Sequence, residues 1–227
     1  MSPLNIVILA AGKGTRMFSS KPKVLHEVAG RPILRHVIDC ALSLSKGALN
    51  PAKIIVVYGF GGDLVKNTFA NENIIWVEQK EQLGTGHAVQ QAAPHLDDDA
   101  TTLILLGDVP LVDAKNCEKL LEKVSNQLVI QSFNKADPTG YGRIIRTNDS
   151  VTAITEHKDA TEAERTIKEV NTGIMAMPAK DLKRWLAGLT NNNAQGEYYL
   201  TDIVSFAVRD KVNVLRKSRM MNGRSLA

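Results

Sequence analysis

The sequence has few of the residues that mark several common classes of protein. It contains only two cysteines, Cys40 and Cys117, and their spacing matches neither a metal site nor a redox motif. In a chain of 227 residues this predicts reduced thiols, a cytoplasmic location and no disulfide framework. Aromatic residues make up 5% of the chain, and no apolar run is long enough to cross a membrane. Disulfide-stapled secreted proteins and membrane proteins are therefore not expected.

Most of the chain also carries little net charge. The formal net charge is +4, but the part from Arg209 onward holds six Lys or Arg against one acid, Asp210, and the preceding part is close to neutral. No aromatic-rich reading surface accompanies the basic end, so the expected partner is a single nucleotide and not a nucleic acid. The five histidines show no spacing that suggests zinc or a catalytic triad, and we interpret them as surface or core residues.

What the sequence does have is an alternation of apolar runs with helical patterns, which predicts one Rossmann-like α/β domain over residues 1–227. Its mixed, mostly parallel sheet should be flanked by helices. The expected strands are Leu4–Ala10, Lys53–Tyr58, Ile74–Val77, Thr102–Leu106, Leu128–Phe133, Gly142–Arg146, Val151–Glu156, Glu169–Met177 and Val212–Leu215. The expected helices are Ile33–Leu44, Asp63–Phe69, Thr85–Ala93, Ala114–Val124, Asp181–Leu189 and Tyr198–Val208.

A glycine-rich loop follows the first expected strand and reads LAAGKGTRM from Leu9 to Met17. Small residues let the backbone approach phosphate oxygens, where main-chain N–H groups donate hydrogen bonds. Lys13 and Arg16 add positive charge for a polyphosphate. The alternative is a tight turn with solvated cations.

Two familiar phosphate motifs do not fit this loop. A Walker loop requires glycine where Val7 stands, and serine or threonine where Gly14 stands. A dinucleotide fold requires an acid at the end of the second strand, which here ends at Tyr58. An NAD-dependent dehydrogenase is therefore not expected.

The loop and the following segment Lys21-Pro22-Lys23-Val24-Leu25 together resemble the signature of sugar-nucleotide pyrophosphorylases. Further segments are similar to the N-acetylglucosamine-1-phosphate uridylyltransferase half of the bacterial bifunctional enzyme, the GlmU family. These segments are Gln79 to Ala88, Leu106 to Pro110, Pro138 to Arg143, Glu156 to Asp159, Val170 to Gly173 and Asn191 to Asp202. The resemblance reaches to about Asp210 and implies a nucleotide-diphospho-sugar transferase fold.

The resemblance also implies how a nucleotide is bound. Two cations are expected to be catalytic, with Arg16 on the departing pyrophosphate and Lys23 near the α-phosphate. The residues expected around the triphosphate are Leu9, Ala10, Ala11 and Gly12.

The uracil-reading residues implied by the resemblance are Gln79, Gly84 and Thr85. An amide side chain donates and accepts at once, which suits the imide edge of uracil. Without the resemblance, Gln79 is a surface residue at a strand end and Thr85 is a helix cap.

Asp108 is the expected ligand of Mg²⁺, because it follows a strand that ends at the carboxyl edge of the sheet. The alternative is an acid that caps the next helix. Leu106 and Gly107, just before it, are expected to contact substrate, although the family usually has tyrosine at the position of Leu106. We expect this departure to alter packing and not the chemistry.

The resemblance assigns the sugar to Gly142, Glu156 and Asn171. Glycine leaves room for a sugar ring, glutamate accepts from hydroxyls, and asparagine both donates and accepts. Individually these residue types are more often turn or surface residues.

The reaction implied by the resemblance joins UTP and N-acetylglucosamine 1-phosphate into UDP-N-acetylglucosamine and pyrophosphate, a step toward bacterial peptidoglycan and lipopolysaccharide. In the family an asparagine supplies a second metal ligand; Asn222 is a candidate for it here, although its surroundings do not match. The family's β-helix acetyltransferase domain is not found in the sequence, so we expect a monomer. Two alternatives stay open: a pyrophosphorylase for another sugar or base, and a catalytically impaired nucleotide-binding module.

Overall fold

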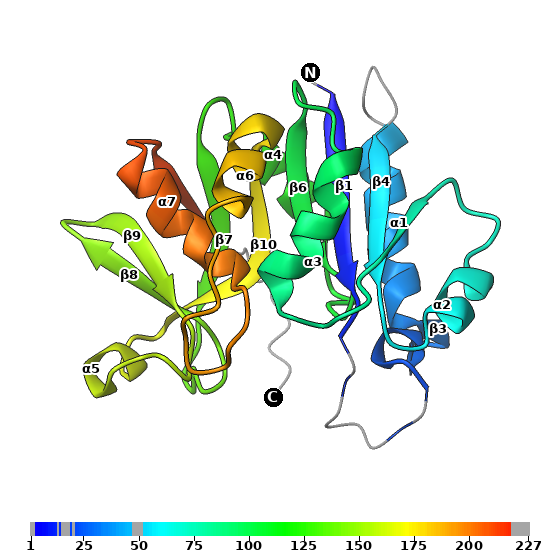
Figure 1. Ribbon diagram of the computed structural model, residues 1–227, viewed down its shortest axis with the longest axis horizontal. Coiled ribbons are helices and arrows are strands. Elements are labelled where there is room, and N and C mark those ends of the chain that lie inside the picture. The colour runs from blue at the N-terminus through cyan, green and yellow to red at the C-terminus, as the bar shows by residue number, and fades with distance from the viewer. Residues whose placement is uncertain (1–2, 13, 15–18, 20, 47–51, 219–227) are drawn as a thin grey trace.

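The computed structural model describes residues 3–12, 14, 19, 21–46 and 52–218 (Figure 1). Within them, a nine-stranded sheet is formed, with a small separate pair β2 (Glu27–Val28) and β3 (Arg31–Pro32). The strands of the large sheet are β1 (Leu4–Ala10), β4 (Lys53–Tyr58), β5 (Ile75–Glu78), β6 (Thr101–Leu106), β7 (Leu128–Asn134), β8 (Arg143–Thr147), β9 (Ser150–Thr155), β10 (Glu169–Pro178) and β11 (Val214–Ser218).

The main path of the sheet runs in the order β11-β7-β10-β6-β1-β4-β5. Strand β1 pairs in parallel with β4 and β6, β4 with β5, and β11 with β7, whereas β10 is antiparallel to both of its neighbours β6 and β7. Only β10 therefore runs against the others on this path, which confirms the predicted mixed, mostly parallel sheet. The hairpin β8–β9 branches from β10.

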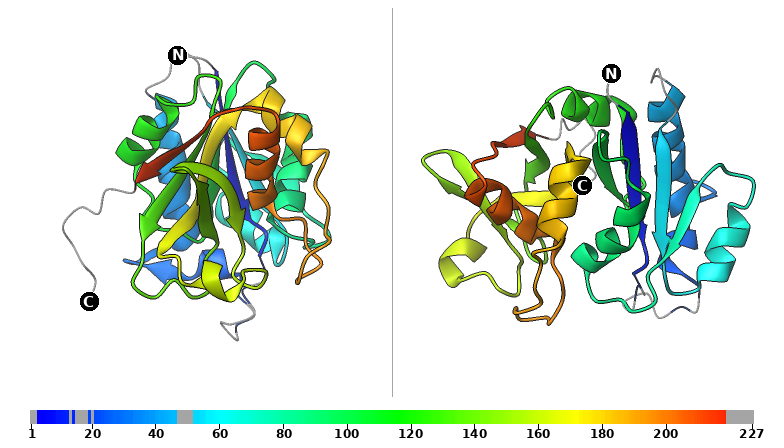
Figure 2. Two further views of the ribbon diagram at one scale, coloured as in Figure 1. Left: turned by 90° about the vertical axis from the view of Figure 1, so that its left-hand side faces the viewer. Right: turned by 45° about the horizontal axis from the view of Figure 1, so that its top comes forward.

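Helices cover both faces of the sheet, as the left view of Figure 2 shows. Helices α3, α6 and α7 pack on one face, and α1, α2 and α4 pack on the other. The helices are α1 (Ile33–Lys46), α2 (Gly62–Thr68), α3 (Thr85–Ala92), α4 (Ala114–Leu121), α5 (Glu162–Arg165), α6 (Ala179–Leu186) and α7 (Ile203–Arg209). No helix among the described residues is long and apolar enough to span a membrane.

Successive side chains of each strand are divided between the hydrophobic clusters on the two faces of the sheet. In β1, Val7 belongs to the cluster under α3, whereas Ile6 and Ile8 belong to the cluster under α1. Successive side chains of a strand point to opposite faces, so a continuous apolar run is what a sheet covered on both sides requires. The run from Leu4 to Ala10 therefore predicts a buried strand, and the structure confirms its bounds.

Most expected elements are present with shifts of a few residues, but three expectations need correction. The helix expected from Tyr198 begins later, with a 3₁₀ turn Leu200–Asp202 before α7. Helix α4 ends at Leu121 and not at Val124. The short helix α5 was not expected; it begins with a capping box in which the side chains of Thr161 and Glu164 each bond the other's backbone N–H.

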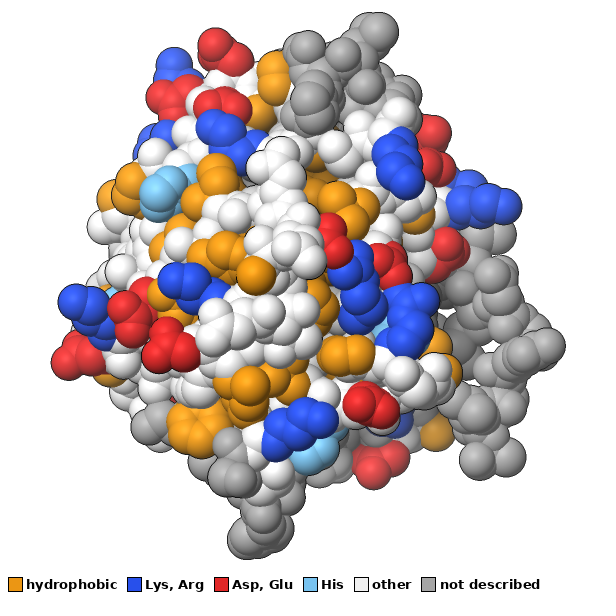
Figure 3. Space-filling view, turned by 90° about the vertical axis from the view of Figure 1, so that its right-hand side faces the viewer, with side chains coloured by type: hydrophobic (Ala, Val, Ile, Leu, Met, Phe, Trp, Pro, Cys, Tyr) orange, Lys and Arg blue, Asp and Glu red, His pale blue; other side chains and the backbone are white. Residues whose placement is uncertain are grey.

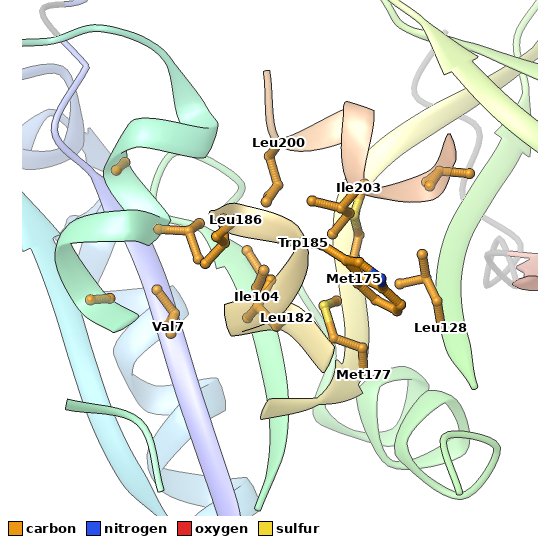
Figure 4. Packing of buried hydrophobic residues seen from close by; sticks show 14 of the residues in the cluster. Val7, Ile104, Leu128, Met175, Met177, Leu182, Trp185, Leu186, Leu200 and Ile203 are labelled. Carbon is orange, nitrogen blue, oxygen red and sulfur yellow. The ribbon is translucent and has the colours of Figure 1, made fainter. Parts of the chain in front are cut away.

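Trp185 is the largest fully buried side chain and fills the centre of the cluster between β10, α6 and α7 (Figure 4). Its indole Nε1 donates a hydrogen bond to Asp210 Oδ2 at 2.9 Å, so its single polar atom is satisfied. Its ring therefore contributes apolar burial without leaving an unpaired donor.

We expect Trp185→Ala to lower the free energy of unfolding by about 3–5 kcal/mol, because it opens a cavity in a close-packed core. Urea unfolding followed by circular dichroism measures the change. Leu64→Ala is the control, since Leu64 is 52% exposed and its truncation should cost little. Equal shifts for the two variants would contradict this description of the core.

Candidate nucleotide and sugar site

Four parallel strands end at one edge of the sheet, and each delivers a segment that the sequence singles out. Strand β1 leads into Ala11 and Gly12, β4 into Gly59, β5 into Gln79, and β6 into Gly107 and Asp108. Because these strands run in the same direction, their carboxyl ends meet at the same edge, at the bottom of Figure 1. The fold therefore gathers residues that lie up to about a hundred positions apart.

A cavity of about 430 Å³ opens beside this edge. Eight of the residues expected from the sequence line it together, and they come from seven separate parts of the chain. They are Leu9, Lys23, Thr85, Leu106, Asp108 and, from the second half, Gly142, Glu156 and Asn171 as the expected sugar contacts.

Lys23 and Asp108 face each other in the lining of the cavity. Lys23 Nζ donates to Asp108 Oδ2 at 2.6 Å, and the two side chains are 39% and 36% exposed. A half-exposed pair of this kind adds little to stability, since water screens both charges. Its significance is chemical, because it places one cation and one carboxylate side by side where they remain accessible to a ligand.

The structure argues against the alternative interpretation of Asp108 as a helix cap. Helix α4 is capped by Asp113, whose side chain accepts a hydrogen bond from the backbone N–H of Lys115. Asp108 is left with Lys23 as its partner and lines the cavity.

The glycine loop lies beside Asp108. Ala10 and Ala11 are buried, Gly12 is exposed, and the N–H of Gly107 donates to the Leu9 carbonyl at 2.8 Å. A Cβ atom on Gly107 would lie 3.0 Å from Ala10 Cβ, so a larger residue would push β1 and β6 apart at this edge. The expected phosphate ligands Lys13 and Arg16 lie outside the described residues.

Gln79, Gly84 and Thr85 form one tight turn at the end of β5. The Gln79 side chain is 3% exposed, and its Nε2 donates to the Gly84 carbonyl at 3.0 Å. Gly84 has φ of +110°, and a Cβ there would lie 2.6 Å from the carbonyl oxygen of Tyr198. Glycine is therefore required at this position. The Thr85 hydroxyl accepts from the Leu200 N–H at 3.1 Å, so its partner lies across the cavity and not in its own helix.

At the opposite end of the cavity, Gly142, Glu156 and Asn171 lie against one another. A Cβ on Gly142 would lie 3.5 Å from both carboxylate oxygens of Glu156, and the Asn171 N–H donates to the Gly142 carbonyl at 2.9 Å. Asn171 Oδ1 accepts from the Gly173 N–H at 3.1 Å, which leaves its Nδ2 group available as a donor. Together these groups offer an acceptor and a donor beside a space kept free by glycine.

Glu156 is a largely buried carboxyl group with other acidic side chains nearby. Burial raises its pKa above the ordinary 4.5, and nearby Asp202 and Asp159 act in the same direction. The Thr201 hydroxyl donates to Glu156 Oε1 at 3.0 Å, which partly opposes the shift. Burial also raises the pKa of Asp202.

Leu106 stands where the family has tyrosine, and the structure shows what it contacts. A Cβ on Gly173 would lie 2.5 Å from Leu106 Cδ1, so Leu106 fills the space above the bulge in β10. The expectation that this departure affects packing agrees with that contact.

Sequence reasoning missed several residues that line the cavity. Tyr141, Thr172 and Thr201 are among them, and His87 was assigned to the surface or core although it contacts Gln79. Thr201 lies in the segment Asn191 to Asp202 that the resemblance covered, which was the available signal. No group of three or more His, Cys, Asp or Glu among the described residues could hold a metal ion by itself, and Asn222 lies outside them.

The sequence matches known proteins over most of its length. A family model described as a MobA-like NTP transferase domain matches residues 6–171. A bifunctional protein GlmU from Methylobacillus flagellatus is 60% identical over 209 residues, which cover 92% of this chain and 44% of that protein. A bifunctional protein GlmU from Neisseria meningitidis serogroup C is 55% identical over 212 residues, 93% of this chain and 45% of that protein. The chain thus spans less than half the length of these curated relatives.

Solved structures show the same fold at low sequence identity. A putative glucose-1-phosphate thymidylyltransferase from Bacillus anthracis has a TM-score of 0.73 at 18% identity and covers 95% of this chain and 86% of its own. An inositol-1-phosphate CTP transferase from T. maritima has a TM-score of 0.71 at 16% identity, covering 94% and 84%. The Rossmann-like nucleotidyltransferase fold expected from the sequence is confirmed.

We expect Glu156→Gln to raise the free energy of unfolding at pH 8 but not at pH 4. Glu156 has a raised pKa, so the folded protein holds this proton more tightly than the unfolded chain does. Its contribution to stability is complete below the ordinary pKa and is lost as the pH rises through the raised one. Urea unfolding at both pH values measures the effect, with exposed Glu162→Gln as control. A loss of stability at pH 8 would refute the assignment.

Proposed function

Since the chain belongs to the MobA-like NTP transferase domain family, we propose that it transfers uridylyl from UTP to N-acetylglucosamine 1-phosphate. The products are UDP-N-acetylglucosamine and pyrophosphate. The single observation that supports the proposal best is the shared cavity, which has Lys23 and Asp108 at one end and Gly142, Glu156 and Asn171 at the other. The bifunctional GlmU relatives support the choice of base and sugar, because they match this chain at 54–60% identity.

The two ends of the cavity suit the two halves of the product. A phosphorylated sugar would place its ring against Gly142, with hydroxyl groups on Glu156 and the acetamido oxygen or a hydroxyl on the Asn171 amide. The uracil would lie toward Gln79, Gly84 and Thr85. The phosphates would then lie between them, beside Lys23, Asp108 and the loop that begins at Leu9.

The chemistry needs alignment and charge neutralisation more than proton transfer. The attacking oxygen belongs to a phosphate that is already an anion near neutral pH, so no general base is required. Lys23 is close enough to Asp108 to be shared between that carboxylate and an α-phosphate oxygen. Arg16, which lies outside the described residues, is proposed for the pyrophosphate side. Holding mutually repelling anions in line is where such a site gains its rate.

Nucleotidyltransferases related to GlmU generally use a divalent metal ion, and we propose Mg²⁺ for this chain. The residues fit, because Asp108 offers accessible carboxylate oxygens beside the space for the triphosphate, and such oxygens are the donors that Mg²⁺ prefers. When bound there, the ion would neutralise phosphate charge.

The proposal extends to the setting of the reaction. We propose that residues 1–227 act as one nucleotidyltransferase domain, monomeric when isolated (light scattering would test this), and located in the cytoplasm, where the buried thiols of Cys40 and Cys117 stay reduced. The product would serve bacterial peptidoglycan and lipopolysaccharide synthesis. A nucleic-acid partner is not proposed; on the face seen in Figure 3, cationic and anionic side chains are interspersed.

Pyrophosphate release from purified protein tests the proposed function directly. UTP, N-acetylglucosamine 1-phosphate and a Mg²⁺ titration are expected to give release, and glucose 1-phosphate in place of the acetamido sugar is expected to give little. Equal rates with both sugars would indicate a pyrophosphorylase of another specificity. UTP binding without turnover at any Mg²⁺ concentration would indicate a nucleotide-binding module.

We expect Lys23→Ala to lower kcat about a hundredfold, since losing one electrostatic contact to the transition state costs about 3 kcal/mol. The thermal unfolding midpoint should change little, because Lys23 is half-exposed. Lys21→Ala is the matched control, an exposed lysine two residues earlier that lines no described part of the cavity. A kcat within a few fold of the wild type would remove Lys23 from the mechanism.

A further inference from the structure

The side chain expected to read the base is held by two contacts before any nucleotide arrives. Gln79 Nε2 lies 3.0 Å from the Gly84 carbonyl oxygen and 3.0 Å from His87 Nδ1. His87 lies in the first turn of α3, half-buried, with its ring centroid 6.2 Å from that of Tyr198. The proposed function gives His87 no role.

The first contact determines which end of the Gln79 amide faces inward. A carbonyl oxygen can only accept, so the group beside Gly84 O must be the amide NH₂. The same NH₂ then points its second hydrogen at His87 Nδ1, which must also accept. This contact therefore favours the His87 tautomer with its N–H on Nε2.

This tautomer has a consequence for Gln91. The Gln91 amide lies 3.1 Å from His87 Nε2, and it must present its oxygen there to accept the imidazole proton. A half-turn of the Gln91 amide achieves this and gives up only the bond from Gln91 Nε2 to the His87 carbonyl, which at 3.3 Å is the longest of these contacts. Turning the Gln79 amide instead would break its 3.0 Å bond to the Gly84 carbonyl. The orientation of Gln79 therefore sets the tautomer of His87.

With both N–H groups engaged, Gln79 has only its Oε1 atom left to offer. In the described part of the chain this oxygen has no hydrogen-bond partner, and it is not among the enclosed unpaired atoms, which are His26 Nε2 and Arg143 Nε. The backbone cannot easily yield, because Gly84 and Gly86 each pack directly against Tyr198. Gln79 is thus pre-organised as an acceptor.

If Gln79 Oε1 faces the base, it can distinguish pyrimidines by whether their ring nitrogen N3 carries a hydrogen. Uracil and thymine carry N3–H and can donate to Gln79 Oε1. Cytosine has an unprotonated N3, so two acceptors would face each other and leave both unpaired, which is the costly outcome in a desolvated site. We propose that His87 is a positioning residue that selects UTP over CTP by holding the Gln79 oxygen toward the base. This inference rests on the proposed role of Gln79 in base reading.

The test compares dissociation constants of UTP and CTP, measured by calorimetry without sugar phosphate, in the wild type and two variants. In His87→Leu only the Gly84 carbonyl still holds the Gln79 NH₂, so turning this group toward cytosine breaks one hydrogen bond instead of two, and the preference for UTP should fall tenfold or more. In His87→Asn the side-chain oxygen can take the place of Nδ1, so the preference should be retained. His95→Leu, an exposed histidine beyond α3, is the control.

The ratio of the two dissociation constants separates a positioning role of His87 from a structural one. Loss of a structural role would weaken the binding of both nucleotides equally, and it would affect His87→Asn as well. If the Leu variant does not fold, His87→Gln replaces it, since its amide lies nearer the Nε2 position. A wild-type-like UTP/CTP ratio in the Leu or Gln variant, or a wild type without base preference, would overturn the inference. A ratio that falls as expected in a protein that releases no pyrophosphate would support the inference and refute the proposed function.

Discussion

The common direction of β1, β4, β5 and β6 is the constraint on which the rest of the structure depends. Because these strands are parallel, the segments after them meet at one edge of the sheet. The apolar runs that make these strands are buried on both faces by two layers of helices. The ion pair between Lys23 and Asp108, 85 residues apart in the chain, is a direct product of that arrangement.

The second half of the chain completes the cavity through an irregular strand, β10. Strand β10 runs against the sheet and carries a register shift between Asn171 and Met175, with Gly173 at φ of +82°. This bulge turns the Asn171 region toward β8 and β9, where Gly142 and Glu156 lie. The segment before α7 then reaches back across the cavity, where the Leu200 N–H bonds the Thr85 hydroxyl and the Tyr198 N–H bonds the Leu83 carbonyl. The segment before α7 is thereby tied to the turn that precedes α3.

The sequence predicted the parallel half well and the local chemistry less well. Strands such as Leu4–Ala10 and Lys53–Tyr58 are continuous apolar runs between turn residues, and that pattern has few alternatives. The candidate residues were found by resemblance, and without it Gln79 would have been interpreted as a surface residue at a strand end and Thr85 as a helix cap. The contact of His87 with Gln79 and the hydroxyl of Thr201 on Glu156 could not be predicted, because they depend on side-chain directions across a fold and not on spacing along the chain.

The central claim is that one cavity holds a nucleotide at Gln79 and a sugar at Asn171. The most direct measurement follows the side-chain amide signals of both residues by NMR in ¹⁵N-labelled protein, assigned with Gln79→Glu and Asn171→Asp, during titration with UDP-N-acetylglucosamine. The account predicts that both signals shift with a single dissociation constant, and that UMP shifts the Gln79 signal alone. A shift of only one signal with the full product, or of neither, would contradict it.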